Sequence, residues 1–165
     1  MIFKPKFGGA ALLVLGLFST QTIAATLNVV GEGTARWGPF TVYDATLYAE
    51  NKQPETYLNE GVPLALKLCY ARSVKASDIL KATDKAITKP PTPTLRSALT
   101  KLNRTIKSVD KGDCYQLTYG SGVTRLSLNQ RQLIEVNEPG FKALYFGIWI
   151  GDHALSKSLK QDLLR

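Results

Sequence analysis

The sequence contains few of the residues that metal sites and nucleophilic catalysis require. Its 165 residues include one histidine, His153, and two cysteines, Cys69 and Cys114. A zinc or iron–sulfur site usually takes three or four Cys, His or carboxylate ligands, so this composition argues against one. We therefore expect no metal and no other cofactor.

Motifs for hydrolytic and nicotinamide chemistry are also absent. The chain has no Gly-x-Ser-x-Gly sequence, and Gly120-Ser121-Gly122 is typical of a turn between strands. Gly31-Glu32-Gly33 lacks the third glycine of a dinucleotide-binding loop, so a bulge or turn is the better interpretation. A catalytic thiol would need a neighbouring base, and the sequence offers none beside either cysteine.

The first residues form a targeting segment. Lys4 and Lys6 precede an uncharged apolar run from Gly8 to Phe18, which is too short to span a bilayer. Small residues at Thr22 and Ala24 fit a cleavage site, so we expect a signal peptide over residues 1–24 and one domain over residues 25–165. Export to a bacterial periplasm is the simplest destination. That location permits disulfides and argues against nucleic acid as a partner, although the pI is near 9.5.

The mature chain changes from strands to helices and back. Alternating apolar residues predict strands over 27–30, 40–48, 64–70, 114–120, 123–128 and 132–136. Helical spacing predicts a helix from Ser77 to a stop at Pro90, and a second that Thr94 caps and that runs to Val109. A third is expected over 141–150 with Gly151 as a left-handed cap, and a short fourth over 157–164. This order predicts an α+β fold.

Positive charge is concentrated in the helical pair. The formal net charge is +8, and residues 72–111 carry ten basic residues against three acidic ones. This distribution suits an anionic membrane surface or an anionic ligand, but a solvated helical face would also produce it.

Arg36 is the first candidate for a ligand anchor. It lies beside Trp37 in an aromatic stretch, and a guanidinium among aromatic residues can hold a carboxylate or phenolate oxygen. An exposed arginine on a strand is the alternative. Cys69 and Cys114 both leave the apolar faces of their strands, so they pair as a disulfide if those strands are neighbours, and otherwise stay as thiols.

Four motifs in order resemble the chalcone isomerase-like family. They are the Gly31-x-Gly33 strand, Val42-Tyr43-Asp44-Ala45-Thr46-Leu47-Tyr48, the strand from Leu64 to Tyr70, and the tail from Phe141 to Gly151 with its terminal Leu-rich helix. The resemblance is nearest to the exported bacterial members. It implies an open-faced β-sandwich, in which a curved antiparallel sheet packs against helices and leaves a ligand cleft between them.

The resemblance also suggests site residues. The plant enzymes of this family hold their substrate with an arginine, a threonine, a tyrosine and an asparagine, whereas non-catalytic relatives bind fatty acids through the arginine. Arg36 matches the arginine, Tyr43 takes the threonine position, and Asn103 is the candidate asparagine. Residues 73–109 contain no aromatic residue, so the tyrosine is missing.

The broken catalytic set favours a non-catalytic protein that binds a small apolar or fatty-acid-like anion, with Arg36 and Tyr43 as ligand-binding residues. The alternatives are an intramolecular lyase or isomerase with a diverged site, and an interaction module that uses the basic helical face.

Overall fold

A computed structural model describes residues 26–165, so the predicted signal peptide lies outside the described residues. Six strands form one antiparallel sheet in which the spatial order follows the chain order. The strands are β1 (Asn28–Trp37), β2 (Phe40–Ala49), β3 (Leu64–Tyr70), β4 (Cys114–Gly120), β5 (Val123–Leu128) and β6 (Arg131–Val136). Each strand pairs antiparallel with its predecessor, and the predicted turn at Gly120-Ser121-Gly122 joins β4 to β5.

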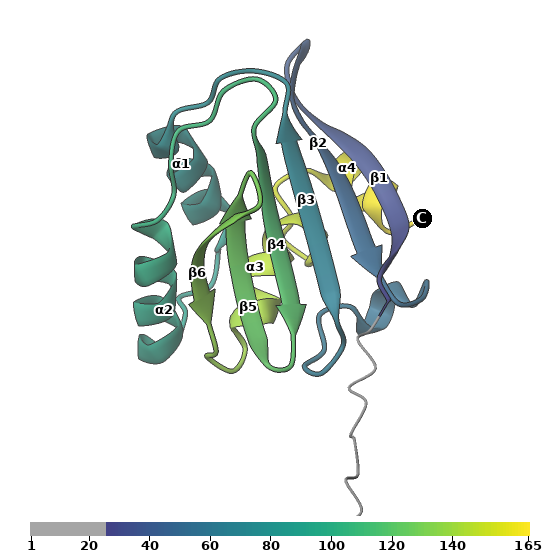
Figure 1. Cartoon of the computed structure of the whole chain (residues 1–165), viewed down its shortest axis with the longest axis vertical. Coiled ribbons are helices and arrows are strands. Elements are labelled where there is room, and N and C mark those ends of the chain that lie inside the picture. Colours follow the sequence, from purple (N-terminus) through teal and green to yellow (C-terminus); the bar gives the residue numbers. More distant parts are fainter. Residues whose placement is uncertain (1–25) are drawn as a thin grey trace, which may run out of the picture.

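In the described part of the chain, four α-helices accompany the sheet, together with one 3-10 turn, η1 (Pro54–Thr56). They are α1 (Ala76–Ala86), α2 (Pro93–Asn103), α3 (Phe141–Ile150) and α4 (Lys157–Leu163). In Figure 1, α3 and α4 lie behind the sheet, while α1 and α2 stand along its β6 side. The predicted α+β class and the curved antiparallel sheet packed against helices are confirmed. Within residues 26–165, no helix is long and apolar enough to cross a membrane.

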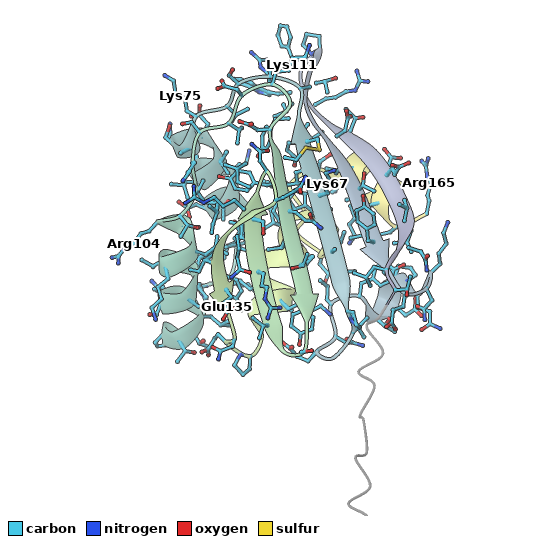
Figure 2. All side chains as sticks on the ribbon, in the orientation of Figure 1. Lys67, Lys75, Arg104, Lys111, Glu135 and Arg165 are labelled. Atoms are coloured by element: carbon cyan, nitrogen blue, oxygen red, sulfur yellow. A yellow bond between two sulfur atoms is a disulfide. The ribbon has the colours of Figure 1, made fainter. Side chains whose placement is uncertain are left out.

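The sheet is covered on one face and open on the other. Leu66 of β3 and Leu117 of β4 pair across the strands on the covered face, and both are buried. Their neighbours in sequence, Lys67 and Gln116, pair on the opposite face and are only half-buried. Figure 2 shows Lys67 and Glu135 on this open face. The period of two in the sequence therefore separates a core face from a solvent face.

Helix α4 lies against β1 because two glycines leave room for it. A Cβ atom on Gly31 would lie 2.0 Å from the carbonyl oxygen of Leu163, and one on Gly33 would lie 2.8 Å from atoms of Leu159 and Asp162. The β1–β2 register shifts between Val29 and Gly31, as the bulge interpretation of this motif predicts. These glycines thus serve close packing of helix on strand.

A disulfide joins Cys69 and Cys114 at the ends of β3 and β4. The two residues are directly opposite in the strand register, with Cα atoms 4.1 Å apart. The bond closes the chain segment that carries α1 and α2. It therefore fixes the point where this helical pair leaves the sheet and returns to it.

The second helix is shorter than predicted. It begins after Thr92, whose hydroxyl accepts the Leu95 N–H, and it ends at Asn103 instead of Val109. Beyond it, the Tyr115 hydroxyl bonds both the N–H and the carbonyl of Lys107, at 2.8 and 3.1 Å. These backbone groups would be used internally in a helix, so tertiary contacts override the helical spacing here.

The predicted left-handed cap at Gly151 is wrong, since its backbone is extended (φ −79°, ψ 179°). Glycine is needed there for space, because a Cβ would lie 2.7 Å from the Gly147 carbonyl oxygen. The left-handed residue is Gly140, with φ of +80°, where the chain enters α3.

Candidate functional site

A cleft of about 580 Å³ lies between the covered face of the sheet and helices α1 and α3. It sits at the end of the sheet where β2 begins and β3 ends. The strands contribute Trp37, Val42, Tyr43 and Tyr70; the chain after β3 contributes Arg72, Ser73, Val74 and Lys75; α1 contributes Asp78, Ile79, Lys81, Ala82 and Thr83; and the C-terminal part contributes Ile148, Trp149 and Leu155.

The floor of the cleft is aromatic. The indole Nε1 of Trp149 donates a 3.0 Å hydrogen bond to the hydroxyl of Tyr43. The Tyr43 ring lies 5.4 Å from that of Tyr70, centroid to centroid. Burial raises the pKa of Tyr43, and the Trp149 hydrogen bond partly opposes this rise. Because α3 carries Trp149 and β2 carries Tyr43, the contact joins the two layers beneath the cleft.

A small inner cavity of about 30 Å³ continues this floor toward the core. Tyr70 and Tyr115 line it with ring centroids 6.3 Å apart, and Tyr145 of α3 faces the same space. Burial is the main cause that raises the pKa of Tyr70 and of Tyr145. These phenols therefore stay neutral at pH 7 and can donate hydrogen bonds without acting as bases.

The rim of the cleft carries positive charge. Lys81 pairs with Asp78 at 3.6 Å, whereas the ion pairs within residues 26–165 leave out both Arg72 and Lys75. The guanidinium of Arg72 lies 5.2 Å from the centroid of the Phe40 ring, so an aromatic side chain supports it. Two cations therefore stand at the mouth with no carboxylate partner.

An apolar chamber with a cationic rim suits an amphipathic anion, whose chain enters and whose head stays at the mouth. Within residues 26–165, no cluster of three or more His, Cys, Asp or Glu side chains could hold a metal ion.

The structure places the predicted site residues differently. Tyr43 lies in the cleft, as expected of a ligand-binding residue. Arg36 is exposed and is not among the lining residues. The reason is strand alternation: Ala35 points inward and is buried, so Arg36 turns outward. The β1–β2 register shifts at this point, where Val42 of β2 is the unpaired residue. The arginine that lines this cleft is Arg72.

Asn103 lies at the end of α2, away from the cleft. It lines a separate surface hollow with residues of α1 and the proline-rich turn, including Asp84 and Pro91. Its Oδ1 is buried with no hydrogen-bond partner in the part of the chain that the structure describes. Asn103 and Tyr43 are therefore not parts of one site.

The sequence pattern missed Arg72 and Trp149. Arg72 is the first residue of the basic segment 72–111, so the sequence indicates its charge. Its position at the cleft, however, depends on the path of the chain after β3. There the Ala71 N–H bonds the Val42 carbonyl at 2.9 Å, and Val74 and Val109 form a bridge. Trp149 was noted only as part of the tail motif, since helical spacing alone does not distinguish a core residue from a cleft residue.

A second polar cluster, at the opposite end of α3, is structural. Lys142 is buried, and its ammonium donates 2.6 Å hydrogen bonds to the carbonyls of Asn59 and Val62. Glu60 accepts from the Tyr119 hydroxyl and from the Gly140 N–H. The cluster ties the loop before β3 to the start of α3. Desolvation lowers the pKa of Lys142 to about 8.

Comparisons with known proteins agree with this architecture. A family model described as chalcone isomerase-like matches residues 18–165. Among solved structures, the chain is similar to the Arabidopsis thaliana fatty-acid binding protein, with a TM-score of 0.67 and 13% identity, over 86% of this chain and 88% of that one. No curated protein matches the sequence. At this identity the structural likeness concerns the fold.

Proposed function

Because the chain belongs to the chalcone isomerase-like family, we propose that it binds a small apolar, fatty-acid-like anion in the cleft and does not transform it. The observation that carries the proposal is an aromatic chamber whose mouth holds the unpaired cations Arg72 and Lys75. The structurally similar Arabidopsis thaliana protein is a fatty-acid binding protein by its title, which supports the same ligand class.

The hydrocarbon chain and the carboxylate head of the ligand would contribute to binding in different ways. Each methylene group that leaves water stabilises the complex by about 0.8 kcal/mol. A cleft of about 580 Å³ falls within the size range of small-molecule sites. A carboxylate at Arg72 would form a charge-assisted hydrogen bond, and two such bonds if the guanidinium binds it in bidentate geometry.

The titratable groups of the cleft favour binding over catalysis. Tyr43 and Tyr70 are neutral at pH 7, since a phenol ionises near pH 10 and burial raises their pKa values further. Asp78 is paired with Lys81 at the mouth. An arginine in the register of Arg36 points out of the cleft, so that position supplies no oxyanion contact. Turnover of a chalcone above the uncatalysed rate would overturn this part of the proposal and favour the diverged isomerase.

We also propose that the chain is exported to the periplasm. The apolar run from Gly8 to Phe18 and the Cys69–Cys114 disulfide both suit an oxidising compartment such as the periplasm. Mass spectrometry of the chain recovered from a periplasmic extract should give a mature N-terminus after Ala24 or Ala25. A full-length mass in the cytoplasmic fraction would contradict export.

The binding test is a calorimetric titration of the mature chain with laurate, palmitate and stearate. We expect saturable binding that tightens with chain length until the cleft is full. Ala82→Phe fills the cleft from α1 and should weaken binding about 5- to 150-fold, since an extra large side chain in a packed site costs about 1–3 kcal/mol.

Ala143→Phe is the matched control, because Ala143 is exposed on α3 and does not line the cleft. Its affinity should equal that of the wild type. No binding of any fatty acid, or equal effects of the two variants, would reject the proposed ligand site.

A further inference from the structure

The tip of the β1–β2 hairpin exposes two aromatic side chains. Trp37 is 78% exposed and Phe40 is 58% exposed, on either side of a Gly38-Pro39 turn. Gly38 has φ of +57°, and a Cβ there would meet no atom within 4 Å, so the turn projects away from the rest of the chain. The exposure of large aromatic side chains to water is unfavourable, and Trp in particular favours membrane–water interfaces.

Cations surround this tip. Arg72 lies with its guanidinium 5.2 Å from the Phe40 ring centroid, and Arg36 precedes Trp37 on the exposed side of β1. Figure 2 shows Lys111 and Lys75 at the same end of the molecule as the hairpin tip, which stands uppermost in Figure 1. This gathering combines an apolar tip with several positive charges.

The acidic residues of the same end are engaged in loop contacts. Asp110 accepts a 2.7 Å hydrogen bond from the Ser73 hydroxyl. Asp113 accepts from the Asp110 N–H and from the Asn129 side chain, at 2.7 and 2.8 Å. These hydrogen bonds hold the carboxylates of Asp110 and Asp113 to the loop. Asp78, the exposed carboxylate at the cleft mouth, pairs with Lys81 at 3.6 Å, so it leaves Arg72 and Lys75 without an acidic partner.

The tip is continuous with the cleft. Trp37 and Arg72 belong both to the exposed end and to the lining of the cleft mouth. A surface that received the tip would therefore lie directly over the mouth, and an apolar molecule could pass between that surface and the cleft without crossing water.

We propose that this docking end, made of Trp37, Phe40, Arg72, Lys75 and Lys111, binds an anionic lipid bilayer and places the cleft mouth against it. The inference goes beyond the proposed function, because docking needs no molecule in the cleft. Aromatic side chains would enter the interfacial layer, while the guanidinium and ammonium groups would meet lipid phosphates. The α2 face, with Arg96 and Lys101 on the helix and Arg104 directly after it, is assigned no direct role.

The test is co-sedimentation of the mature chain with vesicles of phosphatidylglycerol and phosphatidylcholine, against phosphatidylcholine alone. We expect binding to the anionic vesicles that weakens as salt rises, and little binding to neutral ones. Each basic residue at a membrane surface contributes about 1 kcal/mol, so Lys75→Gln/Lys111→Gln should weaken binding about 25-fold. Trp37→Ser/Phe40→Ser should weaken it comparably through lost apolar burial.

Lys101→Gln/Arg104→Gln is the control of equal charge on α2, and Figure 2 places Arg104 away from the tip. Its affinity should stay within about threefold of the wild type, because salt screens charges that lie away from the docking end (Figure 2). A loss as large as that of Lys75→Gln/Lys111→Gln would show nonspecific attraction and overturn the proposal. Unchanged binding by Trp37→Ser/Phe40→Ser, or no binding of the wild type, would overturn it too.

Insertion can be followed separately through fluorescence. The chain has two tryptophans, so Trp149→Phe leaves Trp37 as the only indole emitter. We expect its emission to shift to shorter wavelength and to be quenched by brominated lipid in anionic vesicles; an unchanged spectrum on bound protein would contradict insertion. Ala82→Phe should dock normally even when it binds no fatty acid, so failure of the cleft proposal and failure of docking can be told apart.

Discussion

The indole nitrogen of Trp149 lies 3.0 Å from the hydroxyl oxygen of Tyr43, although 106 residues separate them in the chain. This bond connects α3 to β2 and fixes two rings that line the floor of the cleft. The site thus depends on a contact between layers, which neither element could supply alone.

The guanidinium of Arg72 at the cleft mouth should bind the carboxylate of the ligand. Arg72→Gln should lower the affinity for palmitate by about 10- to 100-fold, since a hydrogen bond to a charged group contributes about 1.5–3 kcal/mol. Arg36→Gln is the matched control on the exposed side of β1 and should bind as the wild type does. Calorimetric titration measures both; a loss confined to Arg36→Gln would restore the anchor that the sequence predicted.

The disulfide should stabilise the fold substantially. Its two cysteines are 45 residues apart, and in the chain-entropy model a loop of that length contributes about 4 kcal/mol. Cys69→Ser/Cys114→Ser should therefore lower the free energy of unfolding by about 3–4 kcal/mol in urea titrations. A change below about 1 kcal/mol, or equal midpoints with and without reductant in the wild type, would contradict a bond that constrains the unfolded chain.

The buried tyrosines predict loss of stability at alkaline pH. Burial raises the pKa values of Tyr43, Tyr70 and Tyr145 in the folded state, while unfolded tyrosine ionises near pH 10. The unfolded chain then releases protons first, so this contribution to stability is complete below about pH 10 and falls as the pH rises toward the folded pKa values.

Phenolate absorbance and circular dichroism should check this behaviour in one titration. Ionisation of the buried tyrosines should coincide with loss of secondary structure. Full ionisation of all seven tyrosines with the fold intact would contradict their burial.

Packing of α4 on β1 should be intolerant of a single added carbon. Gly31→Ala places a methyl group against the Leu163 carbonyl, so it should cost about 2–3 kcal/mol of stability through displacement of the helix. Gly120→Ala is the control, because a Cβ there meets no atom within 4 Å, and it should change stability by less than about 0.5 kcal/mol. Thermal unfolding compares them, and equal midpoints would argue against the close approach.

Local patterns in the sequence predicted most of the elements. The strand from Leu64 to Tyr70 follows from strict alternation, and the cysteines were placed outside the apolar faces by the same argument. The predicted bounds of the second helix were wrong at both ends, since it begins after Thr92 and ends at Asn103. Its predicted extension to Val109 failed because the Tyr115 hydroxyl holds the backbone of Lys107 from a strand that follows later in the chain.

The site was only partly predictable. Tyr43 was expected to bind the ligand because of the family resemblance, and it lies in the cleft. Arg36 was expected as the anchor, but it is exposed because Ala35 before it takes the inward position on β1. Arg72 reaches the mouth through hydrogen bonds that redirect the chain after β3. Such positions depend on tertiary contacts and not on periodicity.

If an apolar anion occupies the chamber next to Trp149, fluorescence quenching of this indole should detect it. In a Trp37→Phe variant, Trp149 is the only indole emitter, so titration with a fatty acid brominated along its chain reports on the cleft floor alone. We expect saturable quenching that an excess of palmitate reverses and that Ala82→Phe abolishes. Undiminished Trp149 emission at saturating brominated fatty acid would show that the ligand does not bind in this cleft.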